Sequence, residues 1–166
     1  IDTWGVDNSA EMIKKAKNNA ERRSVKVRFR KLSLENWHLH IRREFDFILC
    51  LGNTLPHILN KNKLKFVLKN INNKLSEKGI FIGQILNYDR IMKFKERIVN
   101  VKKVQSHTFI RFYDFYKDKL IFNILLLSEE SEKITHKLFS TRLSSIFKDE
   151  IAGILKEIGF RKVCIY

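Results

Sequence analysis

The sequence has 166 residues, of which 44% are hydrophobic and 11% aromatic, enough for the buried core of one globular domain. No apolar run is long enough to span a bilayer, and no signal peptide precedes the first strand-like segment, so we expect a cytoplasmic protein without a membrane partner. The formal net charge of +15 raises the question of a nucleic-acid partner. Because lysine and arginine are spread over every predicted helix, a solvated surface is favoured over nucleic-acid binding.

The first thirty residues predict a strand, a helix and a second strand. Residues 3–7 are a short apolar segment, and Ser9 is placed to cap a helix whose apolar positions repeat at helical spacing to about residue 23. Apolar and basic residues alternate over residues 25–30, as in a half-buried outer strand. The chain begins with Ile1 and ends within an apolar run, so we expect an internal piece of a longer protein.

The next segments predict a parallel sheet. Residues 45–51 are apolar apart from Asp46, which is the composition of a central strand covered on both faces. We expect a helix over about residues 61–76, with Gly79 closing its turn, and a strand over residues 80–86. Alternating strands and helices of this kind favour an α/β fold with helices on the faces of the sheet.

After Tyr88 the pattern becomes antiparallel. We expect a short basic helix to about residue 98, then strands over residues 109–115, 120–127 and 133–146 with short polar turns such as residues 116–119. A helix over about residues 147–158 and a strand over residues 160–166 follow. We therefore predict a single partial domain over residues 1–166, with an antiparallel β insertion over residues 104–145 whose aromatic residues mainly form its own core, while some could cover a substrate.

Polar residues follow three of the predicted strands. In an open α/β sheet, ligands bind outside the carboxyl ends of the parallel strands. We therefore expect one pocket to be lined by Asp7 after the first strand, Gly52 and Asn53 after the strand at 45–51, and Asn87 and Tyr88 after the strand at 80–86.

Asp7 is a candidate ligand for a ribose. A carboxylate in this position can accept hydrogen bonds from both hydroxyls of the sugar, because its two oxygens match a vicinal diol. A helix-capping role beside Ser9 fits the residue equally well. Since the same carboxylate also serves NAD enzymes, Asp7 indicates an adenosine-type ligand better than it indicates a reaction.

Four segments together resemble the class I S-adenosylmethionine (SAM)-dependent methyltransferases, in particular the small-molecule N-methyltransferases of the glycine/sarcosine type. The resemblance extends over nearly the whole chain. It rests on GVDNSAEMIKKA (residues 5–16), FDFILCLGNTLPHI (45–58), LSEKGIFIGQILNYDRI (75–91) and DEIAGILKEIGFRKVCIY (149–166). It implies a Rossmann-like parallel-sheet domain that carries the antiparallel insertion, with SAM as cofactor and a small molecule as methyl acceptor.

The resemblance also implies roles for individual residues. Asp7 would hold the ribose, Met12 would pack on the adenine ring, and Ser33 would bond the adenine amine where family members often have aspartate. The implied cofactor residues are Asp7, Asn8, Met12, Ser33, Leu34, Cys50, Leu51 and Gly52. The implied acceptor residues are Asn53, His57, Asn87 and Tyr88, with His57 favoured for positioning over proton removal.

One part of the family pattern is not among these residues. The glycine-rich loop that embraces the methionine part of SAM would precede Ile1. The resemblance therefore implies that the 166 residues by themselves do not form the complete cofactor site and need not be active alone.

Other functions stay open. The charge of +15 motivates methylation of RNA, although GNTLPH does not carry the two prolines and the aromatic residue that usually stack on and hold an extruded base. A non-catalytic binding module could keep the fold, whereas an NAD-linked dehydrogenase would not explain CLGN or NYD. No metal site is expected, because His38 and His40 have no third ligand nearby.

Overall fold

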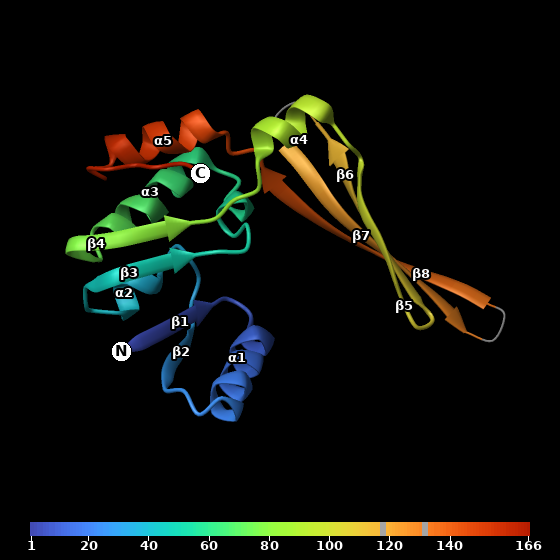
Figure 1. Cartoon of the computed structure of the whole chain (residues 1–166), viewed down its shortest axis with the longest axis horizontal. Helices are drawn as coiled ribbons and strands as arrows, with labels where there is room; N and C mark the ends of the chain where they lie inside the picture. Colours follow the sequence, from blue (N-terminus) through green and yellow to red (C-terminus); the bar gives the residue numbers. More distant parts are fainter. Residues whose placement is uncertain (117–118, 131–132) are drawn as a thin grey trace.

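The computed structural model describes residues 1–116, 119–130 and 133–166. The first part of the chain forms parallel strands with helices, and the second part is dominated by a long antiparallel sheet that projects from it (Figure 1). The fold is α/β, as the sequence predicts. The predicted turn at residues 116–119 includes residues 117 and 118, which lie outside the described part of the chain.

The parallel strands form two pairs. Strand β1 (Thr3–Asp7) pairs with β2 (Val27–Lys31), and β3 (Phe45–Cys50) pairs with β4 (Leu75–Gly83). No hydrogen-bonded ladder joins one pair to the other within the described residues. Figure 1 shows β1, β3 and β4 running in the same direction, so their carboxyl ends lie at one edge, toward the antiparallel sheet.

Helix α1 (Ala10–Arg22) begins where the sequence predicts. The Ser9 hydroxyl accepts a hydrogen bond from the Met12 amide at 3.3 Å, and Glu11 places a negative charge in the first turn. Ile13 is buried on its inner face. The strand that follows starts at Val27 and not at residue 25.

Helix α3 (Lys61–Asn72) supplies the centre of the main core. Its side chains Leu64, Val67, Leu68 and Ile71 are buried, and they pack with Trp37 of the short helix α2 (Trp37–His40) and with Ile151 of α5 (Lys148–Glu157). Asn60 caps the helix by accepting the Lys63 amide at 3.0 Å. The apolar spacing of α3 thus positions the helix against the sheet as predicted.

The boundary between α3 and β4 differs from the sequence prediction. The helix ends at Asn72, and the strand begins at Leu75, opposite Phe45. Gly79 consequently lies within β4 and does not close the helix. A Cβ on Gly79 would lie 2.8 Å from the carbonyl oxygen of Phe45, so this glycine is required by close backbone approach.

Strand β3 is covered on one face only, contrary to the prediction. Ile48 and Cys50 face the core, whereas Phe47 and Leu49 are 63% and 59% exposed. The described helices α3 and α5 cover the first face, and the described residues leave Phe47 and Leu49 largely uncovered. The apolar composition of a strand shows that both of its faces can be buried. It does not determine how much of each face other residues cover.

The antiparallel sheet has four strands in the order β5-β6-β7-β8. The three strands predicted from the sequence are confirmed as β6 (His107–Phe115), β7 (Lys119–Glu130) and β8 (Lys133–Ser144). The predicted helix to residue 98 is wrong in its extent, because α4 (Tyr88–Phe94) ends where Lys95 adopts a left-handed conformation with φ 51°. Residues 98–104 instead form β5 (Ile98–Val104), the edge strand beside β6.

The final segment is not a strand, although the sequence predicts one over residues 160–166. After α5 the backbone is irregular and pairs with no described strand. Phe160 still packs on the core, with its ring 5.9 Å from that of Phe81. A strand needs a neighbour to satisfy its backbone groups, and apolar composition alone does not supply one.

A second cluster joins the sheet to the α/β part. Buried Tyr88 of α4 packs with Tyr113, Leu120 and Leu143 of the antiparallel sheet.

Within the described part of the chain, no helix combines the length and the apolar character needed to cross a membrane.

Candidate functional site

The carboxyl ends of the parallel strands bring most of the predicted cofactor residues to one edge. Asp7 ends β1, and Ser33 and Leu34 follow β2, where the Leu32 amide donates to the Asp7 carbonyl at 3.0 Å. Because β1 and β3 run in the same direction, Cys50 lies at the same edge of the fold (Figure 1). The structure therefore places Asp7, Ser33, Leu34 and Cys50 at the carboxyl ends of parallel strands.

Asp7 has one carboxylate oxygen in use. Its Oδ1 accepts the Ser9 amide at 2.7 Å, which fixes the side chain at the start of α1. Its other oxygen has no hydrogen-bond partner among the described residues, and Met12 is half exposed on the first turn of α1. Asp7 therefore both orders the loop and keeps an acceptor for a hydroxyl group, so the two sequence interpretations of this residue are compatible.

The loop after β3 requires Gly52 and Asn53 in this order. Both residues have left-handed backbone conformations, with φ 74° and 61°, which glycine adopts freely and asparagine tolerates. The Gly52 amide donates to Gln84 Oε1 at 2.8 Å, and a Cβ on Gly52 would meet no atom within 4 Å. This glycine therefore faces open space at the end of a core strand.

Asn53 connects this loop to α4. Its Oδ1 accepts the Leu86 amide at 3.0 Å, and its Nδ2 donates to the Tyr88 hydroxyl at 3.0 Å. Tyr88 is buried, and burial raises the pKa of its phenol to about 12. Asn87 caps α4 by accepting the Arg90 amide at 2.9 Å. Tyr88 and Asn87 thus hold the loop and the helix in place.

We predict that Tyr88→Phe lowers the free energy of unfolding by about 1–2 kcal/mol at neutral pH, because the Asn53 amide loses its partner. The folded protein binds the Tyr88 proton more tightly than the unfolded chain does, so stability is complete below about pH 10 and falls as the pH rises toward 12. Denaturant titrations at pH 8 and pH 11 should show a smaller alkaline loss in the variant. Half-exposed Tyr116, changed to Phe, is the matched control and should leave both values unchanged.

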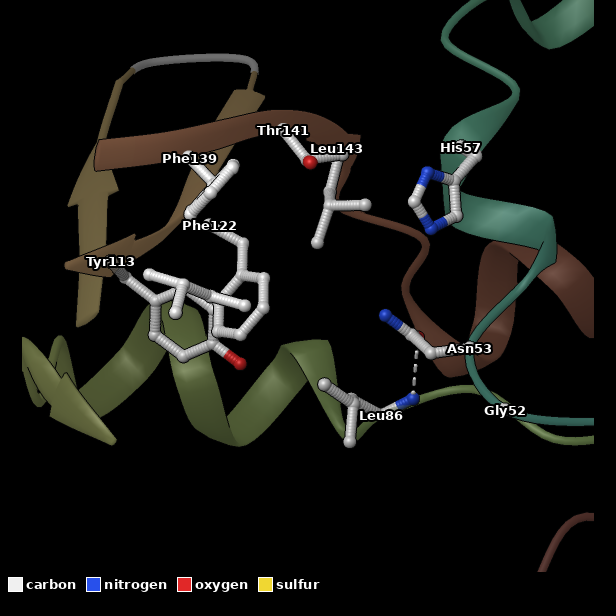
Figure 2. A pocket seen from close by; sticks show the side chains of 10 residues that line it. Gly52, Asn53, His57, Leu86, Tyr113, Phe122, Phe139, Thr141 and Leu143 are labelled. Atoms are coloured by element: carbon white, nitrogen blue, oxygen red, sulfur yellow. Dashed lines mark hydrogen bonds between the residues drawn. The ribbon is translucent and has the colours of Figure 1, made fainter. Parts of the chain in front are cut away.

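A cavity of about 330 Å³ opens between this loop and the antiparallel sheet. Figure 2 shows Asn53 and His57 on one side of it and Tyr113, Phe122 and Phe139 on the other. The full lining consists of Gly52, Asn53, His57, Leu86, Tyr113, Phe122, Ile124, Phe139, Thr141 and Leu143. The cavity is at the lower end of the size range of small-molecule sites.

The predicted acceptor residues divide into two groups. Asn53 and His57 line the cavity, whereas Asn87 and Tyr88 do not. Of the aromatic residues of the insertion, Tyr113 was placed correctly on a strand of the sheet, and it contributes to the wall. The cavity residues on β7 and β8 were not predicted from the sequence. The pattern that could have identified them is the strand alternation, which places Phe122 with Ile124 and Phe139 with Thr141 on one face.

Comparison with known proteins gives a consistent result. A family described as a methyltransferase domain matches residues 1–79. The glycine/sarcosine N-methyltransferase of Aphanothece halophytica is 27% identical over 100% of this chain and 60% of its own length. The carboxy-S-adenosyl-L-methionine synthase of Campylobacter jejuni subsp. doylei is 25% identical over 96% of this chain and 59% of its own length.

Solved structures show the same fold. A SAM-dependent methyltransferase from Clostridium acetobutylicum superposes with a TM-score of 0.80 at 24% identity, covering 95% of this chain and 63% of that one. SAM-bound CalS10, an amino pentose methyltransferase from Micromonospora echinaspora, gives a TM-score of 0.71 at 11% identity, covering 95% of this chain and 65% of that one.

The chain is therefore similar in sequence to a methyltransferase domain over residues 1–79, and similar in fold to solved SAM-dependent methyltransferases over nearly its whole length. The chain spans about 60% of the length of the curated relatives named above.

Proposed function

We propose that the protein is a cytoplasmic, SAM-dependent methyltransferase that acts on a small molecule. In this proposal the two parallel strand pairs belong to one Rossmann-like sheet, residues 1–166 are part of a single domain, and residues 104–145 are its β insertion. The common direction of β1, β3 and β4 supports this arrangement (Figure 1). The names of the relatives support the reaction class.

The proposal is supported most strongly by two features at the carboxyl ends of β1 and β3. Asp7 presents an unused carboxylate oxygen at the end of β1, and Gly52 at the end of β3 opens directly onto the cavity. A nucleoside needs the first feature, and a small acceptor that must meet the cofactor needs the second.

The residues present fit SAM in their chemistry. Asp7 would hold the ribose, exposed Met12 would cover the adenine, and Gly52 would allow the methionine part to approach the backbone. Burial raises the pKa of the Cys50 thiol to about 11, so this side chain stays neutral and serves as a wall. The remaining proposed cofactor residues are Asn8, Ser33, Leu34 and Leu51.

SAM, when bound, supplies a methyl group attached to a sulfonium sulfur. The cofactor therefore already carries its own leaving group. The protein's part is to position the acceptor and exclude water, and Asn53 is well suited to this because both of its polar ends are fixed by hydrogen bonds. We assign His57 a positioning role, since its exposed ring faces the cavity (Figure 2). Acceptor contacts by Asn87 and Tyr88 stay predictions.

Isothermal titration calorimetry of the full-length protein with SAM tests the proposal. We expect binding of one SAM per chain and competition by S-adenosylhomocysteine, the product that SAM leaves after methyl transfer. NAD⁺, which contains the same adenosine, is the control and should not compete. A full-length protein that gives no heat with SAM, or that prefers NAD⁺, would overturn the proposal.

A further inference from the structure

The cavity has two chemically different walls. The wall from the α/β part contains the polar side chains of Asn53 and His57. The wall from the antiparallel sheet is mainly aromatic and aliphatic: Phe122, Ile124, Phe139 and Leu143 carry no polar atom, and Tyr113 and Thr141 each carry one hydroxyl. Figure 2 shows these two walls facing each other across the space above Leu86. A ligand in this cavity meets polar groups at one end and apolar groups along its body.

No lysine, arginine, aspartate or glutamate is among the described residues that line the cavity. Arg142 follows Thr141 on β8, so strand alternation directs it to the opposite face of the sheet. Arg111 is paired with Ile124 on the cavity face of the sheet, and its guanidinium donates to Asn100 at 3.4 Å, on β5, which lies on the side of β6 away from β8. Among the described lining residues, His57 is the only one with an imidazole ring, and the residue is exposed.

This composition discriminates between acceptors. In an α-amino acid the carboxylate is attached to the carbon that bears the amine, so both groups would enter the polar end of the cavity together. Such a carboxylate would lose water without a cation among the described lining residues to receive it, and burial of an unpaired charge is strongly unfavourable. The ammonium of an amine on an apolar body also loses water, but the body adds no second charge and gains contact with the sheet wall.

We propose that the methyl acceptor is an amine carried on an uncharged, mainly apolar body and is not an α-amino acid. This inference rests on the proposed function, because it concerns the acceptor of the same reaction. It separates this protein from its glycine/sarcosine-named relatives on the basis of the cavity wall. Phe139 is central to it, because this side chain lines the cavity and is still 55% exposed, leaving apolar surface for a ligand to cover.

Two probes that differ only in a carboxylate test the proposal. The full-length protein is first saturated with S-adenosylhomocysteine and is then titrated calorimetrically with 2-phenylethylamine or with L-phenylalanine. We expect 2-phenylethylamine to bind at least about tenfold more tightly, with glycine and sarcosine weaker still. Equal or tighter binding of L-phenylalanine, glycine or sarcosine would overturn the inference while leaving the proposed function intact. Failure of S-adenosylhomocysteine to bind would remove the proposed function and this inference with it.

A pair of variants on β8 locates the effect. Phe139→Ala should weaken binding of 2-phenylethylamine about fivefold, because it removes part of the apolar wall. The control is Leu138→Ala, at a position that is 56% exposed on the opposite face of the same strand. The control should bind the amine normally, and both variants should bind S-adenosylhomocysteine normally. Equal effects of the two substitutions on the amine would contradict the assignment of the wall.

Discussion

Substitution of Asp7 by asparagine is expected to weaken SAM binding by the full-length protein about 10- to 100-fold, the usual range for loss of a charged hydrogen-bonding partner. The change keeps one oxygen for the Ser9 amide, so the start of α1 should remain ordered. It replaces the other acceptor with a donor and removes the negative charge, so the side chain can no longer accept both hydroxyls of a ribose. Calorimetric titration with SAM measures the loss.

Asp46→Asn is the matched control for this prediction. Asp46 is also a strand carboxylate, but it lies near the amino end of β3 and accepts the Ser76 hydroxyl at 3.0 Å. Its substitution should leave SAM affinity within about twofold of the parent protein, because surface polar contacts contribute little at a distance. If the two variants lost affinity equally, the effect could not be assigned to a ribose contact at Asp7.

Truncation of Leu68 to alanine is expected to lower the free energy of unfolding by about 2–5 kcal/mol. Leu68 has 0% exposure in the middle of α3, where it belongs to the core formed with Trp37, Ile71 and Ile151. The substitution removes buried methyl groups and leaves a cavity that a tightly packed core fills only in part. Guanidinium unfolding of the full-length protein, followed by circular dichroism, measures the change.

Leu39→Ala serves as the control for the core prediction. Leu39 also lies in a helix, α2, but it is 65% exposed, so its truncation should change the free energy of unfolding by less than about 0.5 kcal/mol. A small effect of Leu68→Ala, comparable to that of the control, would mean that α3 is not packed as the structure describes.

The parallel part of the fold could be predicted from local sequence signals. The Ser9 cap, the apolar spacing of α3 and the apolar run that becomes β3 each report a structure that forms within a short stretch of chain. Because carboxyl ends of parallel strands gather at one edge, the positions of Asp7 and Gly52 in the fold followed from the order of elements alone.

The edges of the sheets could not be predicted in the same way. Strand β5 is exposed along its whole length, and its state depends on pairing with β6, not on burial of a repeated face. The segment 160–166 shows the reverse case: it is rich in apolar residues, but it pairs with no described strand and is not a strand itself. Pairing is a property of the partner as much as of the segment, so neither outcome can be derived from the segment itself.

The cavity was only half predictable. Asn53 and His57 follow a recognisable strand end, but the opposite wall depends on the register of β7 against β8, in which Phe122 meets Thr141 and Ile124 meets Phe139. A shift of one residue would turn these side chains to the other face. The hydrogen bond between Asn53 and Tyr88 likewise joins residues 35 positions apart, which no local pattern specifies.

A crystal structure of the full-length protein with S-adenosylhomocysteine tests most directly whether the carboxyl ends of β1 and β3 together bind the cofactor. We predict that the ribose hydroxyls lie within hydrogen-bonding distance of the Asp7 carboxylate and that the sulfur lies beside Gly52, facing the cavity. A ligand found away from the carboxyl ends of β1 and β3, with Asp7 engaged only by its own helix, would contradict the account.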